Sequence, residues 1–493
     1  MEHTGRIKRG LTPTARRILF GATTEESVAA ELKQVARVDR AHLLMLAEQR
    51  IIARAQAADL LRTIDELEQT GFAPLLTMPA PRGLYLAYED YLIEQLGGAT
   101  GGVLQTARSR NDLNATILKL RLRAPYLNLL RESLRLTAVL IHLARRYAGV
   151  TMPAYTHYQA AVPVTYGHYL AGVASALQRD AASLLALSDD LNSSPLGAGA
   201  VGGTSWAIEP QRTAELLGFN STVDHSIDAV ASRDLVLRLL ASVTVFGVTL
   251  SRLVSDLLLW TTSEFEFLSV PDELVGSSSM MPQKRNPFML EHVQGRSGVV
   301  LGAFAGAVTA MHGKPFTNSI AVGTEAVKPV WDALKSITEA TTLLRLFVAG
   351  ARPNDAAMLQ RAVVGYTSAT ELANRFVSEE GWAFRRAHYE VGVLINEAIE
   401  RGETLESALA RKRNGNSAKT DLDPSAVAKA SAFGGGPGAA SVARIIDQLR
   451  QRWRVQSEAK RNLANQWAAA ELSLRETAKN FVRDFNEEKV QHV

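Results

Sequence analysis

The feature that most constrains this chain is a stretch from Arg233 to Trp260 that contains no proline and a single glycine, Gly247. Within it, leucine, valine and phenylalanine recur mainly at steps of three and four residues, which is the spacing of one face of an α-helix. The spacing predicts one helix of about 28 residues, roughly 42 Å long at 1.5 Å per residue. Such a helix needs neighbours of similar length along its apolar face.

Other parts of the chain show the same long helical period. Neighbouring long helices form a bundle, and Pro125 is expected to kink the first of them. The apolar faces are too wide for the core of one bundle, so partner subunits are expected to cover the excess. The ranges with this period are 112–147, 166–190, 295–312 and 325–350.

The remaining segments predict shorter helices on either side of this bundle. Hydrophobic residues make up 46% of the 493 residues and aromatic residues 6%, with alanine and leucine dominant, which favours helices over strands. The tail from Asp447 predicts a charged helix. We therefore expect an all-α protein with an N-terminal helical domain at 1–110, a long-helix bundle at 111–362 and a small helical domain at 363–493.

Composition narrows the class of protein. The chain has no cysteine, so disulfides and thiolate metal sites are excluded. The net charge of +4 is small for this length, and no basic stripe with interleaved aromatics indicates nucleic-acid binding. The basic start lacks the apolar segment of a signal peptide, and the apolar runs are too interrupted to span a membrane. A cytoplasmic protein that binds a small molecule is the expectation.

The first of three polar segments runs from Gln105 to Thr116 and opens a long predicted helix. Ser109 or Asn111 could cap that helix. Free N–H groups at a helix start, together with the guanidinium of Arg108 or Arg110, suit a carboxylate. The alternative is an ordinary helix cap beside solvated arginines.

The second polar segment, Met152 to Leu170, places His157 between prolines. Histidine is the side chain that gains and loses a proton near neutral pH, so it suits acid–base chemistry. The alternative for both His157 and His168 is a structural role.

The third polar segment, Gly276 to Pro287, reads GSSSMMPQKRNP. Glycine and serines supply mobility, N–H groups and hydroxyls, while Lys284 and Asn286 supply a cation and an amide. Such a loop suits closure over a small dianion and stabilisation of a developing negative charge. The alternative is a serine-rich surface loop.

Several stretches together resemble one enzyme family. SSSMMPQKRNP is similar to the signature loop of the aspartase/fumarase superfamily, and TARSRNDLNAT and MPAYTHYQAAVPVTYGHYL are similar to two regions of its argininosuccinate lyase branch. The likeness covers most of the chain. It implies a three-domain helical fold and a homotetramer with a core of long helices. It also implies that each active site combines three polar segments, one from each of three different subunits.

The resemblance also implies a reaction and its residues. Members break a C–N or C–O bond in a succinyl unit and release fumarate. By motif, Ser278 is the base beside the cation Lys284, His157 is the acid or proton relay, and Glu291 orients it. The residues implied to bind the substrate's carboxylates are Ser109, Arg110, Asn111, Thr156, Gln159, Ser279, Lys284 and Asn286.

The chain departs from the argininosuccinate lyase pattern where that family holds its amino acid. Phe288 follows the signature Asn-Pro, where the family has aspartate, and residues 315–328 are apolar and small instead of charged. Tyr85 replaces a histidine of the branch, and the family's N-terminal Trp-Gly-Gly-Arg-Phe element is absent. The fumarate-forming residues are intact while the amine-binding half differs.

We therefore expect a C–N lyase that acts reversibly on an N-substituted aspartate other than argininosuccinate, as ethylenediamine disuccinate lyases of this branch do. Argininosuccinate lyase itself is the first alternative. A non-catalytic, crystallin-like structural protein is the second, against which the intact Ser278, His157, Lys284 and Asn286 count. We expect no metal and no organic cofactor, a dicarboxylate substrate and a homotetramer.

Overall fold

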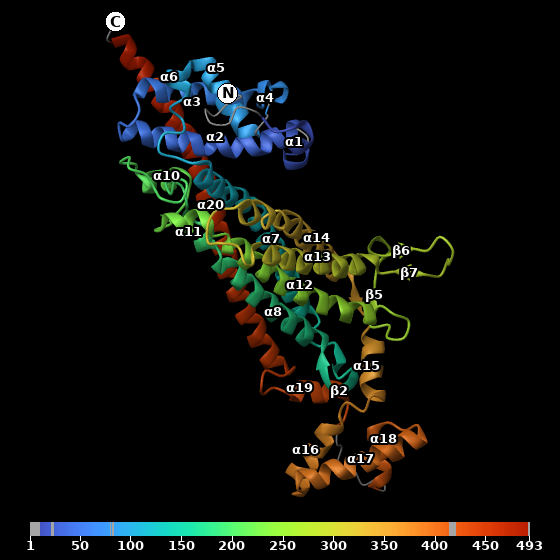
Figure 1. The fold of residues 1–493 in the computed structure, drawn as a ribbon. Coiled ribbons are helices and arrows are strands. Elements are labelled where there is room, and N and C mark those ends of the chain that lie inside the picture. The colour runs from blue at the N-terminus through green and yellow to red at the C-terminus, as the bar shows by residue number, and fades with distance from the viewer. Residues whose placement is uncertain (1–9, 21–23, 79, 81–82, 414–420, 492–493) are drawn as a thin grey trace.

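The computed structural model describes residues 10–20, 24–78, 80, 83–413 and 421–491, and it is mostly helical (Figure 1). Long helices run side by side through the middle of the molecule and confirm the predicted bundle. They are α7 (Arg110–Arg146), α8 (Tyr166–Ala186), α12 (Asp234–Trp260), α13 (Phe288–Met311) and α14 (Pro329–Gly350). Helix α7 continues through Pro125.

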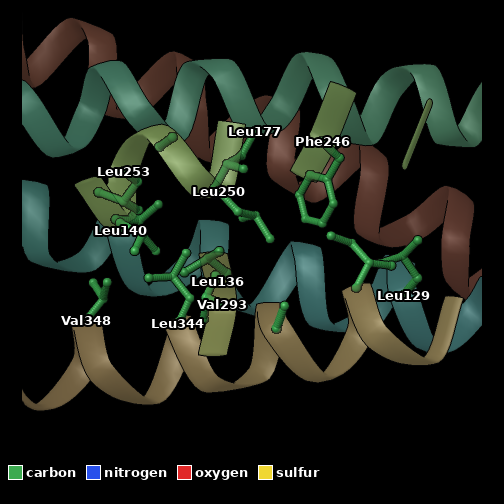
Figure 2. Close-up of a cluster of buried hydrophobic side chains, with 14 of the residues drawn as sticks. Leu129, Leu136, Leu140, Leu177, Phe246, Leu250, Leu253, Val293, Leu344 and Val348 are labelled. Atoms are coloured by element: carbon green, nitrogen blue, oxygen red, sulfur yellow. The ribbon is translucent and has the colours of Figure 1, made fainter. Parts of the chain in front are cut away.

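The bundle core is built from the apolar faces that the helical spacing predicts. Phe246 and Leu250 of α12 are fully buried and point toward leucines of the neighbouring helices, as Figure 2 shows. Val293 of α13 and Leu344 of α14 complete the same cluster. Every long helix contributes to this core, which therefore holds the helices side by side.

Shorter helices precede the bundle and share a second core. Its main members are Leu32 and Leu44 of α2 with Leu60 of α3. The helices that precede the bundle are α1 (Pro13–Phe20), α2 (Glu25–Glu48), α3 (Arg54–Gln69), α4 (Pro74–Thr77), α5 (Leu84–Leu96) and α6 (Gly98–Gly101). Short helices within the bundle region are α9 (Ser188–Leu191), α10 (Pro210–Leu216), α11 (Ser226–Ala231), the 3₁₀ turn Asp272–Leu274 and the π turn Ala321–Glu325.

The C-terminal part has a small core of its own around Leu372, Val391 and Leu394. Its helices are α15 (Asp355–Val364), α16 (Ala369–Glu380), α17 (Phe384–Arg401), α18 (Leu405–Lys412) and α19 (Pro424–Ala430). The chain then forms α20 (Ala439–Gln491), a helix of 53 residues that packs along α7 and α8 and reaches α3 (Figure 1). By its contacts α20 lies with the bundle, although the sequence groups it with 363–493; the three-domain division stays a prediction.

Short strands interrupt the helical pattern at the places where the polar segments lie. β1 (Thr151–Thr156) and β2 (Gln159–Thr165) form an antiparallel hairpin, and β6 (Gly276–Ser277) and β7 (Arg285–Asn286) form another. The second polar segment therefore contains a hairpin that packs against α15 and α19, and the third forms a hairpin that projects from the bundle (Figure 1). The other strand pairs are β3 (Ser193–Ser194) with β4 (Ser221–Thr222), and β5 (Leu268–Ser269) with β8 (Arg352–Pro353).

Part of the bundle surface is apolar. Val245 and Val248 of α12 are 59% and 53% exposed, and Val299 and Leu301 of α13 are 53% and 55% exposed. This surplus fits the predicted burial against partner subunits, which stays a prediction. Among the described residues, α12 is also long and apolar enough to cross a membrane by length and composition, and its opposite face is buried in the bundle core.

Candidate active site

The first polar segment forms the N-terminal turn of α7. Ser109 is the N-cap: its Oγ accepts a hydrogen bond from Asn111 N at 3.2 Å, and its own N–H donates to Asp112 Oδ1 at 3.0 Å. This capping box decides between Ser109 and Asn111 as the cap. The Arg110 side chain is exposed at the turn, where unpaired N–H groups and the helix dipole favour a negative charge.

Arg108 does not present its charge to a ligand, contrary to the expectation that it flanks the site. Its Nη1 pairs with Asp39 Oδ1 at 2.6 Å, and both side chains are buried. Its Nη2 donates to Tyr85 Oη at 3.1 Å. The preceding residue, Ala107, adopts a left-handed backbone with a φ of 60°. Arg108 therefore anchors a strained turn that aims Arg110 outward.

Asp112 is a positioning residue that the sequence reading missed. It is fully buried, and its Oδ2 accepts hydrogen bonds from the N–H groups of Gly197 at 3.1 Å and Gly199 at 3.0 Å. Burial raises the pKa of Asp112, against the N–H groups that lower it. Its carboxylate thereby ties the start of α7 to a glycine-rich loop far along the chain. The capping-box pattern of Ser109 and Asp112 was the available signal.

The second polar segment places His157 at the tip of the β1–β2 hairpin. Thr156 and Gln159 pair across the strands, so His157 and Tyr158 form a two-residue turn. Both turn residues have positive φ, 51° and 62°, in a conformation that asparagine and glycine usually supply. Thr156, His157 and Gln159 are exposed. The paired strands hold this strained turn, and the turn leaves the His157 imidazole exposed.

His168 takes the structural alternative. It lies in the first turn of α8, where its N–H donates to the N-cap Thr165 Oγ1 at 3.1 Å. Burial lowers its pKa. His168 is half-buried beside a cavity of the bundle, whereas His157 is the exposed histidine of this segment.

The third polar segment places Ser278 at the start of the loop between β6 and β7. Its Oγ accepts hydrogen bonds from Met280 N at 3.3 Å and Met281 N at 3.0 Å. Donors directed at this oxygen stabilise negative charge on it. The base of the loop is fixed by the strand pairing and by Arg285, which pairs with Asp272 and donates to Val270 O at 2.7 Å.

A cavity of about 1130 Å³ joins the third polar segment to the bundle. Lys284 and Asn286 line it from the hairpin, and Glu291 lines it from the first turn of α13. The opposite wall is the turn after α12, from Thr261 to Glu266. Ser279 lies on the same loop and is exposed. The structure thus brings Lys284, Asn286 and Glu291 together.

The three polar segments do not meet within one protomer. Helix α7 has 37 residues, so its two ends lie roughly 55 Å apart at 1.5 Å per residue. Arg110 begins this helix, whereas the hairpins of His157 and Ser278 leave the bundle at the other end (Figure 1). Within the described chain, no hydrogen bond joins His157 to Glu291.

A titratable carboxyl lies close to the first segment. Burial raises the pKa of Glu89 to about 7, although the positive charges of Arg108 and Arg110 lower it. Among the described residues, no group of three or more His, Asp or Glu side chains is placed to hold a metal ion.

Comparison with known proteins places these features in a family. A family model described as Lyase matches residues 13–302. Argininosuccinate lyase 1 of Shouchella clausii is 31% identical over 461 residues, which cover 91% of this chain and 93% of the relative. Argininosuccinate lyase of Thermus thermophilus is 37% identical over 372 residues, covering 74% of this chain and 79% of the relative.

A solved structure is similar over nearly the whole length. A variant of EDDS lyase with bound fumarate superposes with a TM-score of 0.84 at 27% identity, covering 96% of both chains. This match confirms the fold expected from the sequence. The chain belongs to the lyase family of the aspartase/fumarase superfamily, as a C–N lyase of the argininosuccinate lyase-like branch.

Proposed function

We propose that the protein catalyses the reversible β-elimination of an N-substituted aspartate to fumarate and an amine. The observation that carries this proposal is Ser278, whose Oγ accepts hydrogen bonds from two backbone N–H groups on a loop that also carries Lys284. A serine acts as a base only where its alkoxide is stabilised, and this loop supplies the donors and a cation. Fumarate bound to the similar EDDS lyase variant supports the dicarboxylate half of the proposal.

In the proposed reaction Ser278 removes the proton from the carbon next to a carboxylate. The electron pair first moves into that carboxylate, which becomes a doubly charged aci-carboxylate, and then forms the C=C bond as the C–N bond breaks. The residues proposed to hold the developing charge are Thr156, Ser279, Lys284 and Asn286. A site that binds this dianion more tightly than the ground state lowers the barrier.

The leaving amine and the second carboxylate need their own partners. His157, oriented by Glu291, donates a proton to the departing nitrogen or relays it. Ser109, Arg110 and Asn111 hold the second carboxylate at the start of α7, and Gln159 adds a contact. Since these groups lie at opposite ends of a protomer, the proposed site combines one polar segment from each of three neighbouring subunits in a homotetramer.

The amine is proposed to differ from arginine. The segment between α13 and α14 presents Phe316 and Ile320, 68% and 70% exposed, and Phe288 follows the signature Asn-Pro. Apolar side chains leave a guanidinium and an amino-acid head group without partners, which costs binding. Argininosuccinate lyase is the second candidate, favoured by the names of the curated relatives. Efficient turnover of argininosuccinate, followed by fumarate absorbance, would establish that candidate instead.

The test of the base is Ser278→Ala. We expect fumarate formation from N-substituted aspartates to fall by roughly three orders of magnitude or more, as when a nucleophile or base is removed, while the assembly is unchanged. Ser277→Ala is the matched control, because Ser277 lies in β6 of the same hairpin; it is exposed, whereas Ser278 is half-buried. Wild-type activity of both variants removes Ser278 from the base role, whereas absence of fumarate formation by wild type favours a non-catalytic, crystallin-like protein.

A further inference from the structure

The loop between β3 and α10 is rich in glycine. At three of these positions the backbone of the loop requires glycine, and at one it does not. Gly197, Gly199 and Gly203 have positive φ values of 106°, 61° and 66°, which side chains rarely adopt. A Cβ at Gly199 would also lie 2.6 Å from Gly203 O. These glycines are required by the fold of the loop itself.

Gly202 has neither reason. Its φ lies outside the left-handed region, and a Cβ placed on it would meet no atom of the described chain within 4 Å. Residues 202 and 204–206 are exposed. No atom of the described protomer fills the space beside Gly202. That space is therefore open to a molecule that approaches from outside the protomer.

The loop is fixed against the first polar segment. Asp112 binds the N–H groups of Gly197 and Gly199, and Asn111 Nδ2 donates to Ala200 O at 3.1 Å. Gly202 follows Ala200 by only two residues, so this open stretch of backbone lies beside the turn that presents Arg110. A molecule held by Arg110 and Asn111 therefore has Gly202 as a close neighbour.

The loop ends in an exposed indole. Trp206 is 53% exposed, although its backbone is held: its N–H donates to Thr204 Oγ1 at 3.2 Å, and its carbonyl accepts from Ile208 N at 2.9 Å. Ile227 is also exposed, at 39%, and it follows Ser226, whose Oγ donates to Val201 O at 2.8 Å. Hydrogen bonds thus hold the chain at these two exposed apolar residues, one of them four residues from the open glycine, and covering them with an apolar ligand is favourable.

We propose that the loop 202–206 is the amine-recognising wall of the active site: Gly202 gives the amine room, and Trp206 covers an apolar, aromatic or aliphatic, substituent on it. The inference rests on the proposed function and deepens it, because it names an amine with an apolar substituent as the substrate class. Trp206 is thereby a specificity-determining residue.

The first experiment uses Gly202→Ala in the full-length protein. Addition of amines to fumarate is followed by loss of fumarate absorbance and by mass spectrometry, with benzylamine and L-phenylalanine as apolar probes and arginine as the charged probe. We expect wild type to use an apolar probe in preference to arginine, and Gly202→Ala to raise the KM of that probe about tenfold, the effect of one methyl-sized mismatch in a pocket. The KM of fumarate stays unchanged.

Gly392→Ala is the matched control, since Gly392 also has an ordinary φ and open space around its Cβ but lies in α17 of the C-terminal part. We expect it to leave every kinetic constant unchanged. If Gly202→Ala behaves like Gly392→Ala, or if it alters the oligomeric mass measured by light scattering, the loop is not an amine wall and the inference fails.

The second experiment compares Trp206→Ala with Trp206→Phe. We expect Trp206→Ala to lower kcat/KM for the apolar probe about tenfold and to leave arginine unaffected, and Trp206→Phe to restore most of the loss. An equal loss for both probes, or a preference of wild type for arginine, overturns the inference while the lyase chemistry stands. Absence of any addition product or fumarate release by wild type, with all probes, overturns the proposed function as well.

Discussion

The buried carboxylate of Asp112 ties the first polar segment to the glycine-rich loop. Asp112→Asn replaces one carboxylate oxygen by an amide N–H₂ group. Depending on the orientation of the amide, either the N–H groups of Gly197 and Gly199 or the N–H groups at the start of α7 lose their acceptor. We expect the free energy of unfolding in urea to fall by about 2–4 kcal/mol.

Asn114→Ala on the same helix is the control, because Asn114 is exposed, and its effect should stay within about 0.5 kcal/mol. Similar stabilities for the two variants would show that the loop is held by other contacts.

The raised pKa of Glu89 predicts that the stability of the protein depends on pH. Its folded-state pKa of about 7 lies above its ordinary value, so between those two pKa values the unfolded chain releases a proton that the folded protein keeps. The contribution of Glu89 to the free energy of unfolding therefore decreases as pH rises through this window. Glu89→Gln removes the effect: we expect equal stability at pH 4 and a gain of about 1–3 kcal/mol at pH 8. A gain that is the same at both pH values would contradict this.

Single residues show how far sequence reasoning reaches into the site. Ser109 was predictable as a helix cap because the capping motif is local, and the structure confirms the cap. The roles of Ser278 and Lys284 stay predictions. The burial of Arg108 was not, because its partner Asp39 lies 69 residues away and neither residue looks unusual alone. Gly202 and Trp206 could not be singled out either, since only coordinates separate a glycine required by φ from one that leaves space.

The close contact between the start of α8 and the end of α7 gives a prediction about helix packing. A Cβ at Gly167, in the first turn of α8, would lie 2.3 Å from Ala144 O and 2.8 Å from the backbone of Ala148. Gly167→Ala must therefore push α8 away from the end of α7, and we expect the free energy of unfolding to fall by about 1–3 kcal/mol, the range for overpacking.

Gly172→Ala in the same helix is the matched control, because a Cβ there meets nothing within 4 Å. We expect it to be neutral or to stabilise by up to about 1 kcal/mol, the helix propensity of alanine over glycine. Thermal unfolding followed by circular dichroism distinguishes the two; a stable Gly167→Ala would show that the helices can separate without cost.

Elements were predictable where their pattern is local. The helical period fixed α12 to within a residue, from Arg233–Trp260 to Asp234–Trp260. Helix α13 begins at Phe288 instead of near 295, because glycines at 295 and 298 blur the apolar period. The hairpin of His157 was missed as a hairpin: strand pairing joins residues that no local period connects, and a His-Tyr turn lacks the usual asparagine and glycine.

The proposed assembly can be tested at the scale of the whole molecule. Val248→Lys on the exposed face of α12 should leave the protomer folded, because Val248 is 53% exposed, but a charge there opposes burial against another subunit. We expect light scattering to show smaller particles with native helical circular dichroism, together with loss of fumarate formation, because one protomer separates the polar segments.

Glu400→Lys, on an exposed position of α17, is the control and should change neither mass nor activity. A fully active, dissociated Val248→Lys protein would show that one chain completes its own site.

The last helix ties the end of the chain to its beginning. Leu474 and Ala478 of α20 are buried among the helices that precede the bundle, and Arg475 pairs with Glu68 at 2.7 Å. During synthesis, Glu68 is made 407 residues before Arg475, its partner on α20. The nascent protein must then hold an unfinished apolar surface until α20 is made, so termination before Leu474 releases a chain open to chaperones and proteases.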